Sequence, residues 1–216
     1  MRNYITYEWF TIFTLIGLLA IVGAKYINSL RFNDFLYVIS NSKYLKIYTK
    51  DQKFIDLFDS FLFTNLSISL SIFSYFVYTE FVSPADFELI TFLKLLFSVA
   101  SILIIKTLLE RLVGSLFEID RLIDNYLFQK TTFKNYLGLL FLAANVLLLY
   151  TNLPVGIVIV STISVIGLIN LIGFLTSFKN HQKLLNPNFF YFLLYLCALE
   201  IAPYVLLYKV FREYNT

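Results

Sequence analysis

The chain has 216 residues, of which 59% are hydrophobic and only 14% are charged. Ordinary soluble domains carry roughly 25% charged residues, so this composition excludes a soluble globular protein. The formal net charge of +3 is small and the basic residues are distributed by loop, as they are in membrane proteins, so we expect no nucleic-acid partner.

The apolar segments predict six transmembrane helices. A helix needs about 20 mostly apolar residues to cross the hydrocarbon core, and the runs here are long and do not alternate as spanning β-strands do. In chain order they cover residues 9–27, 57–78, 87–112 and 136–150, a fifth segment that ends near residue 178, and residues 189–208. Asn152, Pro154 and Gly156 predict a tight turn between the fourth and fifth. The expected fold is an all-α bundle, a single integral membrane domain over residues 1–216.

The basic residues in the predicted loops indicate the orientation, because Lys and Arg are retained on the cytoplasmic side. The loops after the second and fourth segments contain none. The loops after the first, third and fifth contain Lys25, Arg31, Lys43, Lys46, Lys50, Lys53, Lys106, Arg111, Arg121, Lys130, Lys134, Lys179 and Lys183. We therefore expect both termini in the periplasm and these loops in the cytoplasm.

Two of the basic segments have an apolar stripe at helical spacing. The first stripe, opposite Arg31, Asn33 and Asp34, consists of Phe32, Phe35, Leu36 and Ile39. The second, opposite Glu118, Arg121 and Asn125, consists of Leu116, Ile119, Ile123 and Tyr126. Each pattern predicts an amphipathic helix that lies in the membrane interface. The alternative is a docking face for a partner protein.

Charged residues inside spanning segments are candidate functional residues, because burying a charge in lipid is costly. Lys94 in the third segment and Glu200 in the sixth lie at similar depths, counted at about 1.5 Å per residue from the outer helix ends. We expect these two side chains to pair. The pair would be either a structural tie between two helices or a proton- or ion-coupled element.

The second segment has a polar face. It consists of Asp56, Ser60, Thr64, Ser67, Ser71 and Ser74, at intervals of three or four residues. Small hydroxyl residues allow close helix contacts, and the alternative is a groove lined for a substrate. Asn65, Asn145 and Asn170 are expected to satisfy backbone groups of neighbouring helices.

A charge cluster marks the cytoplasmic end of the third segment. Lys106, Glu110 and Arg111 lie there, with Glu118 nearby, and Glu110 and Lys106 are one helical turn apart and can pair. The pattern indicates a solvated helix end facing lipid headgroups, with an anionic-lipid site as the alternative.

The sequence contains few of the groups that enzymes use. His181 and Cys197 are the only histidine and the only cysteine, and there is no phosphate-binding glycine loop and no zinc-protease motif. We therefore expect neither a cofactor nor a metal, and we expect the protein not to be an enzyme. A lipid-modifying enzyme is the least favoured alternative.

Residues 194–203, with the sequence LYLCALEIAP, resemble the C-terminal signature of a family of uncharacterised multi-spanning membrane proteins from Bacteroidetes, described as a domain of unknown function. Residues 111–114 with Phe117, and residues 138–140, are also similar to that family. Ala143 and Ala144 depart from it, since a proline-containing variant would be expected there. Within the resemblance, Glu200 and Pro203 fall in the most distinctive motif.

The resemblance implies the inner membrane of a Gram-negative bacterium, where the gliding and type IX secretion machinery contains small membrane proteins of similar build. The first hypothesis is a non-enzymatic subunit that binds membrane lipids and another inner-membrane or envelope protein. The second is a small ion-coupled transporter or lipid-handling protein that uses Glu200, Lys94 and the polar face of the second segment.

Overall fold

The computed structural model describes residues 4–41, 43–49, 56–83, 87–116 and 120–171, and over these ranges every regular element is a helix. In order they are α1 (Tyr4–Ile27), α2 (Ser29–Leu36), α3 (Lys43–Tyr48), α4 (Leu57–Phe81), α5 (Leu89–Leu116) and α6 (Asp120–Tyr150), followed by a shorter apolar helix, Val155–Leu171. The predicted all-α fold is confirmed. The sixth predicted span, residues 189–208, lies outside the described residues.

Four of these helices, α1, α4, α5 and α6, are long and apolar enough to cross a membrane. Three of them begin and end within a few residues of the predicted first, second and third spans. The fourth, α6, differs from the prediction. The prediction treated residues 116–126 as part of an interfacial helix and began the span at residue 136, but α6 is one continuous helix from Asp120 to Tyr150.

The prediction was wrong because the first half of α6 is rich in polar residues, which lower its hydropathy. Gln129, Thr132 and Asn135 are among them, and the structure buries all three. A polar side chain that faces protein does not break a spanning helix, because the helix satisfies its own backbone groups. Ile123 and Tyr126, expected on an interfacial stripe, are likewise buried in the fold.

Local sequence explains several helix ends. Asn28 caps α2, since its side chain accepts a hydrogen bond from the Arg31 backbone N–H at 3.0 Å. Asp56 caps α4 in the same way through the Phe58 N–H, at 3.3 Å. The predicted turn after α6 is also present. Pro154 stands directly before the helix Val155–Leu171 and its carbonyl accepts the first backbone hydrogen bond of that helix.

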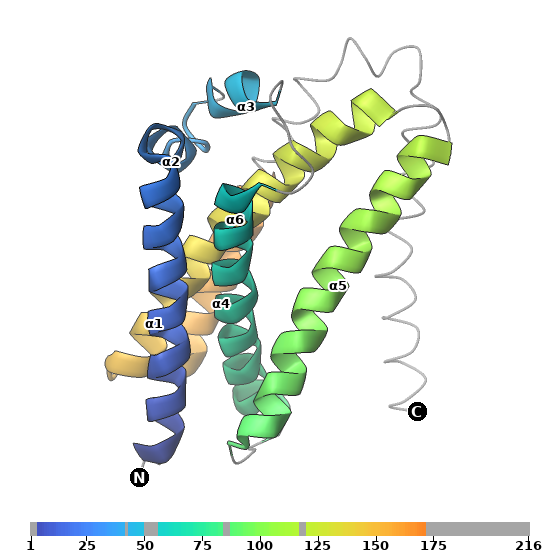
Figure 1. Cartoon of the computed structure of the whole chain (residues 1–216). Coiled ribbons are helices and arrows are strands. Elements are labelled where there is room, and N and C mark those ends of the chain that lie inside the picture. Colours follow the sequence, from blue (N-terminus) through green and yellow to red (C-terminus); the bar gives the residue numbers. More distant parts are fainter. Residues whose placement is uncertain (1–3, 42, 50–55, 84–86, 117–119, 172–216) are drawn as a thin grey trace.

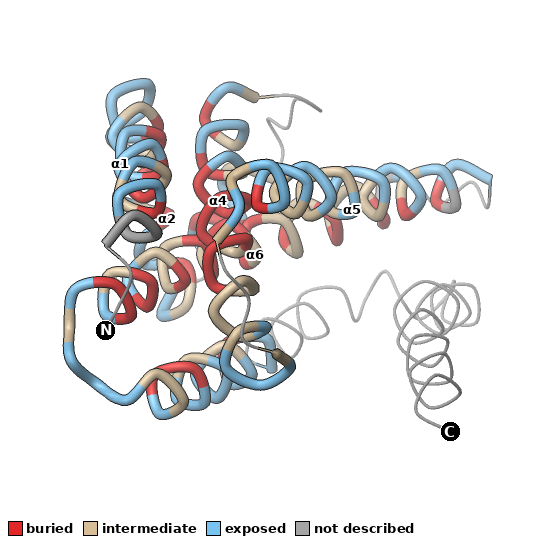
Figure 2. The backbone as a smooth tube through the Cα atoms, turned by 90° about the horizontal axis from the view of Figure 1, so that it is seen from below, coloured by how far each residue is buried: buried red, intermediate tan, exposed pale blue. Residues whose placement is uncertain are grey.

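The helices are arranged around α4, which makes its most extensive contacts with α6 and α1 (Figure 1). Helices α2 and α3 lie at one end of the bundle, together with the end of α5 and the start of α6. The opposite end holds the start of α1, the end of α4 and the start of α5. Seen along the bundle, buried residues concentrate in α4 and α6, whereas α5 is largely exposed (Figure 2).

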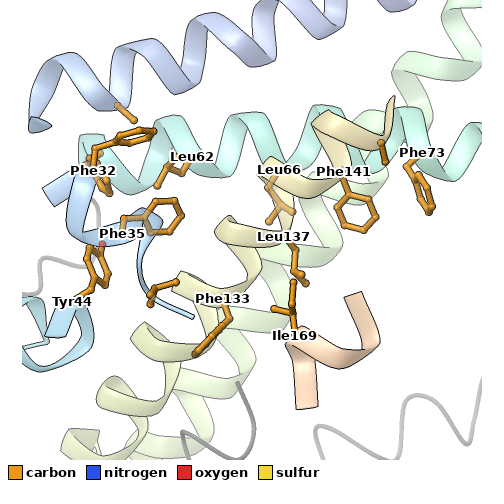
Figure 3. Close-up of a cluster of buried hydrophobic side chains, with 14 of the residues drawn as sticks. Phe32, Phe35, Tyr44, Leu62, Leu66, Phe73, Phe133, Leu137, Phe141 and Ile169 are labelled. Atoms are coloured by element: carbon orange, nitrogen blue, oxygen red, sulfur yellow. The ribbon is translucent and has the colours of Figure 1, made fainter. Parts of the chain in front are cut away.

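The main core lies between α2, α4 and α6 (Figure 3). Phe32 and Phe35 of α2 belong to this core and are buried, so the apolar stripe expected to face lipid turns toward the protein instead. Leu36 of the same stripe remains exposed. A second cluster at the other end packs around Phe10 and includes Phe92 of α5.

Candidate functional site

The pair expected between Lys94 and Glu200 remains a prediction. Lys94 lies near the start of α5 with its side chain exposed. Glu200, and Pro203 beside it in the sequence, lie outside the described residues.

The polar face of the second predicted span separates into two parts in α4. Ser60 and Thr64 are exposed, and their hydroxyls donate to carbonyls of the preceding turn, those of Asp56 and Ser60, both at 2.9 Å. Ser67 and Ser71 are buried, and the Ser71 hydroxyl donates to the Ser67 carbonyl at 2.8 Å. Three of these four hydroxyls are bonded to their own helix, and the fourth, that of Ser67, is buried without a partner among the described residues. The face therefore does not form a continuous polar groove.

Ser74 borders a pocket of about 430 Å³ between α4, α6 and the helix Val155–Leu171. The other lining residues are Leu70, Phe73, Val77, Tyr78, Val82, Phe141, Ile163 and Ile166. Apart from the Tyr78 hydroxyl and Ser74 these side chains are apolar. The pocket therefore offers almost no groups to recognise a polar substrate.

Asparagines, rather than the serine face, form the polar contact between α4 and α6. The buried Asn145 of α6 donates through Nδ2 to the Ser69 carbonyl of α4 at 2.8 Å, as expected for an asparagine that satisfies a neighbouring backbone. Within α4, the Ser69 hydroxyl donates to Asn65 Oδ1 at 3.2 Å. Asn170, in contrast, is exposed.

Two glycines bring the neighbouring helices close to Asn65. A Cβ on Gly17 of α1 would lie 3.0 Å from Asn65 Oδ1. A Cβ on Gly138 of α6 would lie 2.9 Å from the Leu66 Cα and 3.1 Å from Asn65 Nδ2. Small residues that allow backbones to approach are typical of helix contacts in membranes, so this centre joins α1, α4 and α6.

The charge cluster at the end of α5 is not the solvated helix end that the sequence predicted. Glu110 is completely buried, and Oε1 accepts a hydrogen bond from Lys130 Nζ of α6 at 2.6 Å. The Lys130 ammonium also lies 5.5 Å from the centre of the Tyr126 ring. Glu110 therefore forms an ion pair between two helices, and its pairing with Lys106 one turn away stays a prediction.

Two further contacts join the same helices. Arg111 Nε lies 3.4 Å from Asp124 Oδ1, with both side chains partly exposed. A Cβ on Gly114 would lie 2.8 Å from the Ile123 Cβ, so α5 and α6 approach closely there. Glu118, the fourth residue of the predicted cluster, lies outside the described residues.

Sequence reasoning missed a second charged centre, built on Arg31 of α2. Its guanidinium forms ion pairs with Asp56 and with Asp59, the latter at 2.7 Å. Its Nε donates to the Tyr44 hydroxyl at 3.2 Å, and its Cζ lies 4.4 Å from the centre of the Phe58 ring. These partners tie α2 and α3 to the first turn of α4.

Arg31 and Tyr44 in this centre keep their protonation states over a wide pH range. Burial opposes the charge on Arg31, but Tyr44 and the two carboxylates outweigh it and hold the pKa of Arg31 above its usual value. Burial, reinforced by the negative charge of Asp59, raises the pKa of Tyr44, which therefore remains a neutral phenol. The only available signal in the sequence was the spacing of Asp56 and Asp59 at a helix start.

These arrangements hold helices together by charge and hydrogen bonding. Within the described ranges no three His, Cys, Asp or Glu residues are grouped so that they could hold a metal ion. The chemistry that the geometry supports is the pairing of buried opposite charges, at Arg31 and at Glu110, and the recognition of polar groups by buried amides.

Comparisons with known proteins bear on the resemblance seen in the sequence. No curated protein and no solved structure matches the chain. A family model matches residues 10–211, nearly the whole chain, and confirms a domain without assigned function. The chain belongs to the family described as Domain of unknown function (DUF4271).

Proposed function

We propose that this protein is a non-enzymatic subunit of a complex in the bacterial inner membrane and that α5 contacts another membrane protein of the envelope. The observation that carries the proposal is the exposure of the middle of α5. Between Phe92 and Glu110 none of its residues is buried. Figure 1 shows α5 diverging from α4 along this stretch.

Both ends of α5 are firmly attached to the bundle. At one end the Phe92 ring lies 4.9 Å from the Phe13 ring and 5.4 Å from the Phe10 ring, measured between centroids. At the other end the Glu110–Lys130 ion pair and the contact of Gly114 hold α5 to α6. The exposed middle is therefore part of a helix with a fixed position, and the described part of the chain leaves its surface uncovered.

Exposed leucines and isoleucines alone would suit lipid equally well, because lipid tails are as apolar as leucine. The feature that favours a protein partner is a polar row on the same stretch. Lys94, Ser98 and Ser101 follow one another at intervals of four and three residues and so share one face of α5. Small hydroxyl residues on a spanning helix are typical of contacts with another helix.

The proposed orientation has both termini in the periplasm and the basic segments in the cytoplasm. It is supported by the arrangement of the helices, since α2, α3, the end of α5 and the start of α6 all lie at one end of the bundle. These elements carry most of the basic residues of the predicted cytoplasmic loops. From the sequence resemblance we further propose a Bacteroidetes inner-membrane complex such as the gliding or type IX secretion machinery.

Site-specific photo-crosslinking in native membranes tests the proposal. A photoreactive residue at Ser98 is expected to capture a different protein of defined mass. The matched control is Leu19 of α1, which is 68% exposed but belongs to no polar row, and it is expected to capture lipid only. Crosslinks from Ser98 only to lipid, or only within the chain, would contradict the proposal.

The Glu110–Lys130 pair specifically favours a second function, that of a small ion-coupled transporter or lipid-handling protein. A buried carboxylate paired with an ammonium inside two spanning segments is the kind of group that ion relays use. Proteoliposomes loaded with a pH-sensitive dye provide the test. Proton flux in the wild type that is lost in Glu110→Gln would support this function, and no flux in either would refute proton coupling.

A further inference from the structure

The first half of α6 contains a row of buried polar groups without hydrogen-bond partners among the described residues. Gln129, Thr132 and Asn135 are 3%, 2% and 1% exposed. Gln129 Nε2, Thr132 Oγ1, Asn135 Nδ2 and Asn135 Oδ1 are all buried and form no hydrogen bond within the fold. Buried polar groups in native proteins almost always have a partner, so four such atoms within two turns require one.

The position of this row follows from the spacing of its neighbours on α6. Phe128 stacks on Tyr44 of α3 at 5.9 Å between centroids, and Tyr136 packs against Phe35 of α2 at 5.9 Å. Thr132 is four residues from each, so it lies on the same face between them. The polar row is therefore situated beneath the aromatic cap that α2 and α3 place over α6.

Most threonine and serine hydroxyls in these helices donate a hydrogen bond to a carbonyl of their own helix, but the Thr132 hydroxyl does not. Thr14 donates to the Phe10 carbonyl at 2.7 Å and Thr107 to the Leu103 carbonyl at 3.0 Å, each one turn back along its own helix. Thr132 makes no such bond. Its hydroxyl is thus free to bind a group outside its own backbone.

We propose that Gln129, Thr132 and Asn135 form a binding site for a small neutral hydrogen-bonding ligand, either ordered water or a small solute with hydroxyl or amide groups. The unpartnered atoms include the amide donors of Gln129 and Asn135 and the amide acceptor of Asn135, together with a hydroxyl that can do both. All three side chains are uncharged and would not balance the charge of a buried ion, which selects a neutral ligand. This site is independent of the proposed contact at α5.

Isosteric substitutions in the purified full-length protein test the occupancy. If the four atoms have no partner, removing the Thr132 hydroxyl should stabilise the fold, because a buried unpaired group is lost. If the atoms bind a ligand, removing the same hydroxyl should destabilise the fold, because a hydrogen bond to the ligand is lost. Thr132→Val is therefore expected to lower the midpoint of thermal unfolding by about 2–4 °C. Thr64→Val, which alters an exposed hydroxyl on α4, is the matched control and should leave the midpoint nearly unchanged.

Hydroxyl-radical footprinting gives a second readout, because radicals formed from bound water modify side chains that bulk solvent cannot reach. Phe35 and Phe10 are 1% and 0% exposed, but only Phe35 lies beside the proposed site. If the ligand is ordered water, Phe35 is expected to be modified several-fold faster than Phe10, and Thr132→Val should reduce this difference. Equal modification of the two rings, together with a higher unfolding midpoint in Thr132→Val, would overturn the proposal.

Native mass spectrometry distinguishes the two sources of the ligand. A bound solute would give an added mass that is present in wild type and lost in Asn135→Leu, and Phe35 would then be protected from footprinting. Ordered water would give rapid modification of Phe35 without an added mass. No added mass and no modification of Phe35 above Phe10 would leave the four atoms without a ligand and refute the site.

Discussion

Helices α5 and α6 follow one another in the chain, and both are long enough to span the membrane, but they are buried to very different extents. Only 6% of the spanning window of α5 is buried within the protein, against 61% for α6. Apolar character does not explain the difference, because α5 is the more hydrophobic of the two. The same holds for α1 and α4, where the more hydrophobic α1 is 28% buried and α4 is 50% buried.

The comparison shows that polar and small residues, rather than apolar ones, mark the protein-facing side of these helices. In a soluble protein an apolar stripe identifies the side of a helix that faces the core. In a bilayer it does not, because a leucine side chain is as stable in contact with lipid as in contact with protein. Helix α6 carries Gly138, Asn145 and Lys130, each in contact with a neighbouring helix. In the middle of α5, by contrast, none of the described residues is buried.

The largest expected effect is on the ion pair that joins these two helices. Lys130→Met leaves the Glu110 carboxylate buried without its partner, and breaking a buried pair in this way costs about 3–5 kcal/mol. Unfolding by SDS titration in mixed micelles measures the change. Adding Glu110→Gln to Lys130→Met is expected to restore much of the loss.

The partly exposed pair of Arg111 and Asp124 joins the same two helices and serves as the matched control. Asp124→Asn is expected to cost less than about 1 kcal/mol, since exposed ion pairs contribute little. Equal losses at the two pairs would show that burial of Glu110 has no energetic consequence.

Matched leucine truncations test the difference in burial directly. Leu148 of α6 is 2% exposed, and Leu108 of α5 is 46% exposed. Leu148→Ala is expected to cost about 2 kcal/mol, at the low end for core leucines because a bilayer removes the transfer contribution and leaves the cavity. Leu108→Ala should be nearly neutral in the isolated protein. A similar loss at both positions in the SDS titration would refute the comparison.

The sequence predicted the spans that are uninterrupted and apolar, and it failed where polar residues face protein. Helices α1, α4 and α5 were located closely because their apolar runs are long and uninterrupted, which is the pattern that hydropathy detects. The region of α6 was predicted as two separate elements, because polar residues such as Gln129, Thr132 and Asn135 are typical of loops.

The charged contacts between helices could not be predicted from the sequence for a different reason. Hydropathy and helical spacing identify only neighbours one turn apart, such as Glu110 and Lys106. The partner of Glu110 in the structure, Lys130, is 20 residues away, and Arg31 binds carboxylates 25 and 28 residues away. Such pairs depend on how helices pack together, and a single sequence does not encode this packing in any local pattern.

The smallest expected effect concerns the amide contact between α6 and α4. Asn145→Leu removes the hydrogen bond from Nδ2 to the Ser69 carbonyl, and hydrogen bonds between membrane helices contribute about 0.6 kcal/mol on average. Asn170→Leu changes the same side chain at an exposed position and should leave stability unaltered or slightly raised. The difference between the two variants in one SDS titration therefore isolates what a buried amide contributes, and its absence would mean that core packing and the glycine contacts hold α6 to α4 without it.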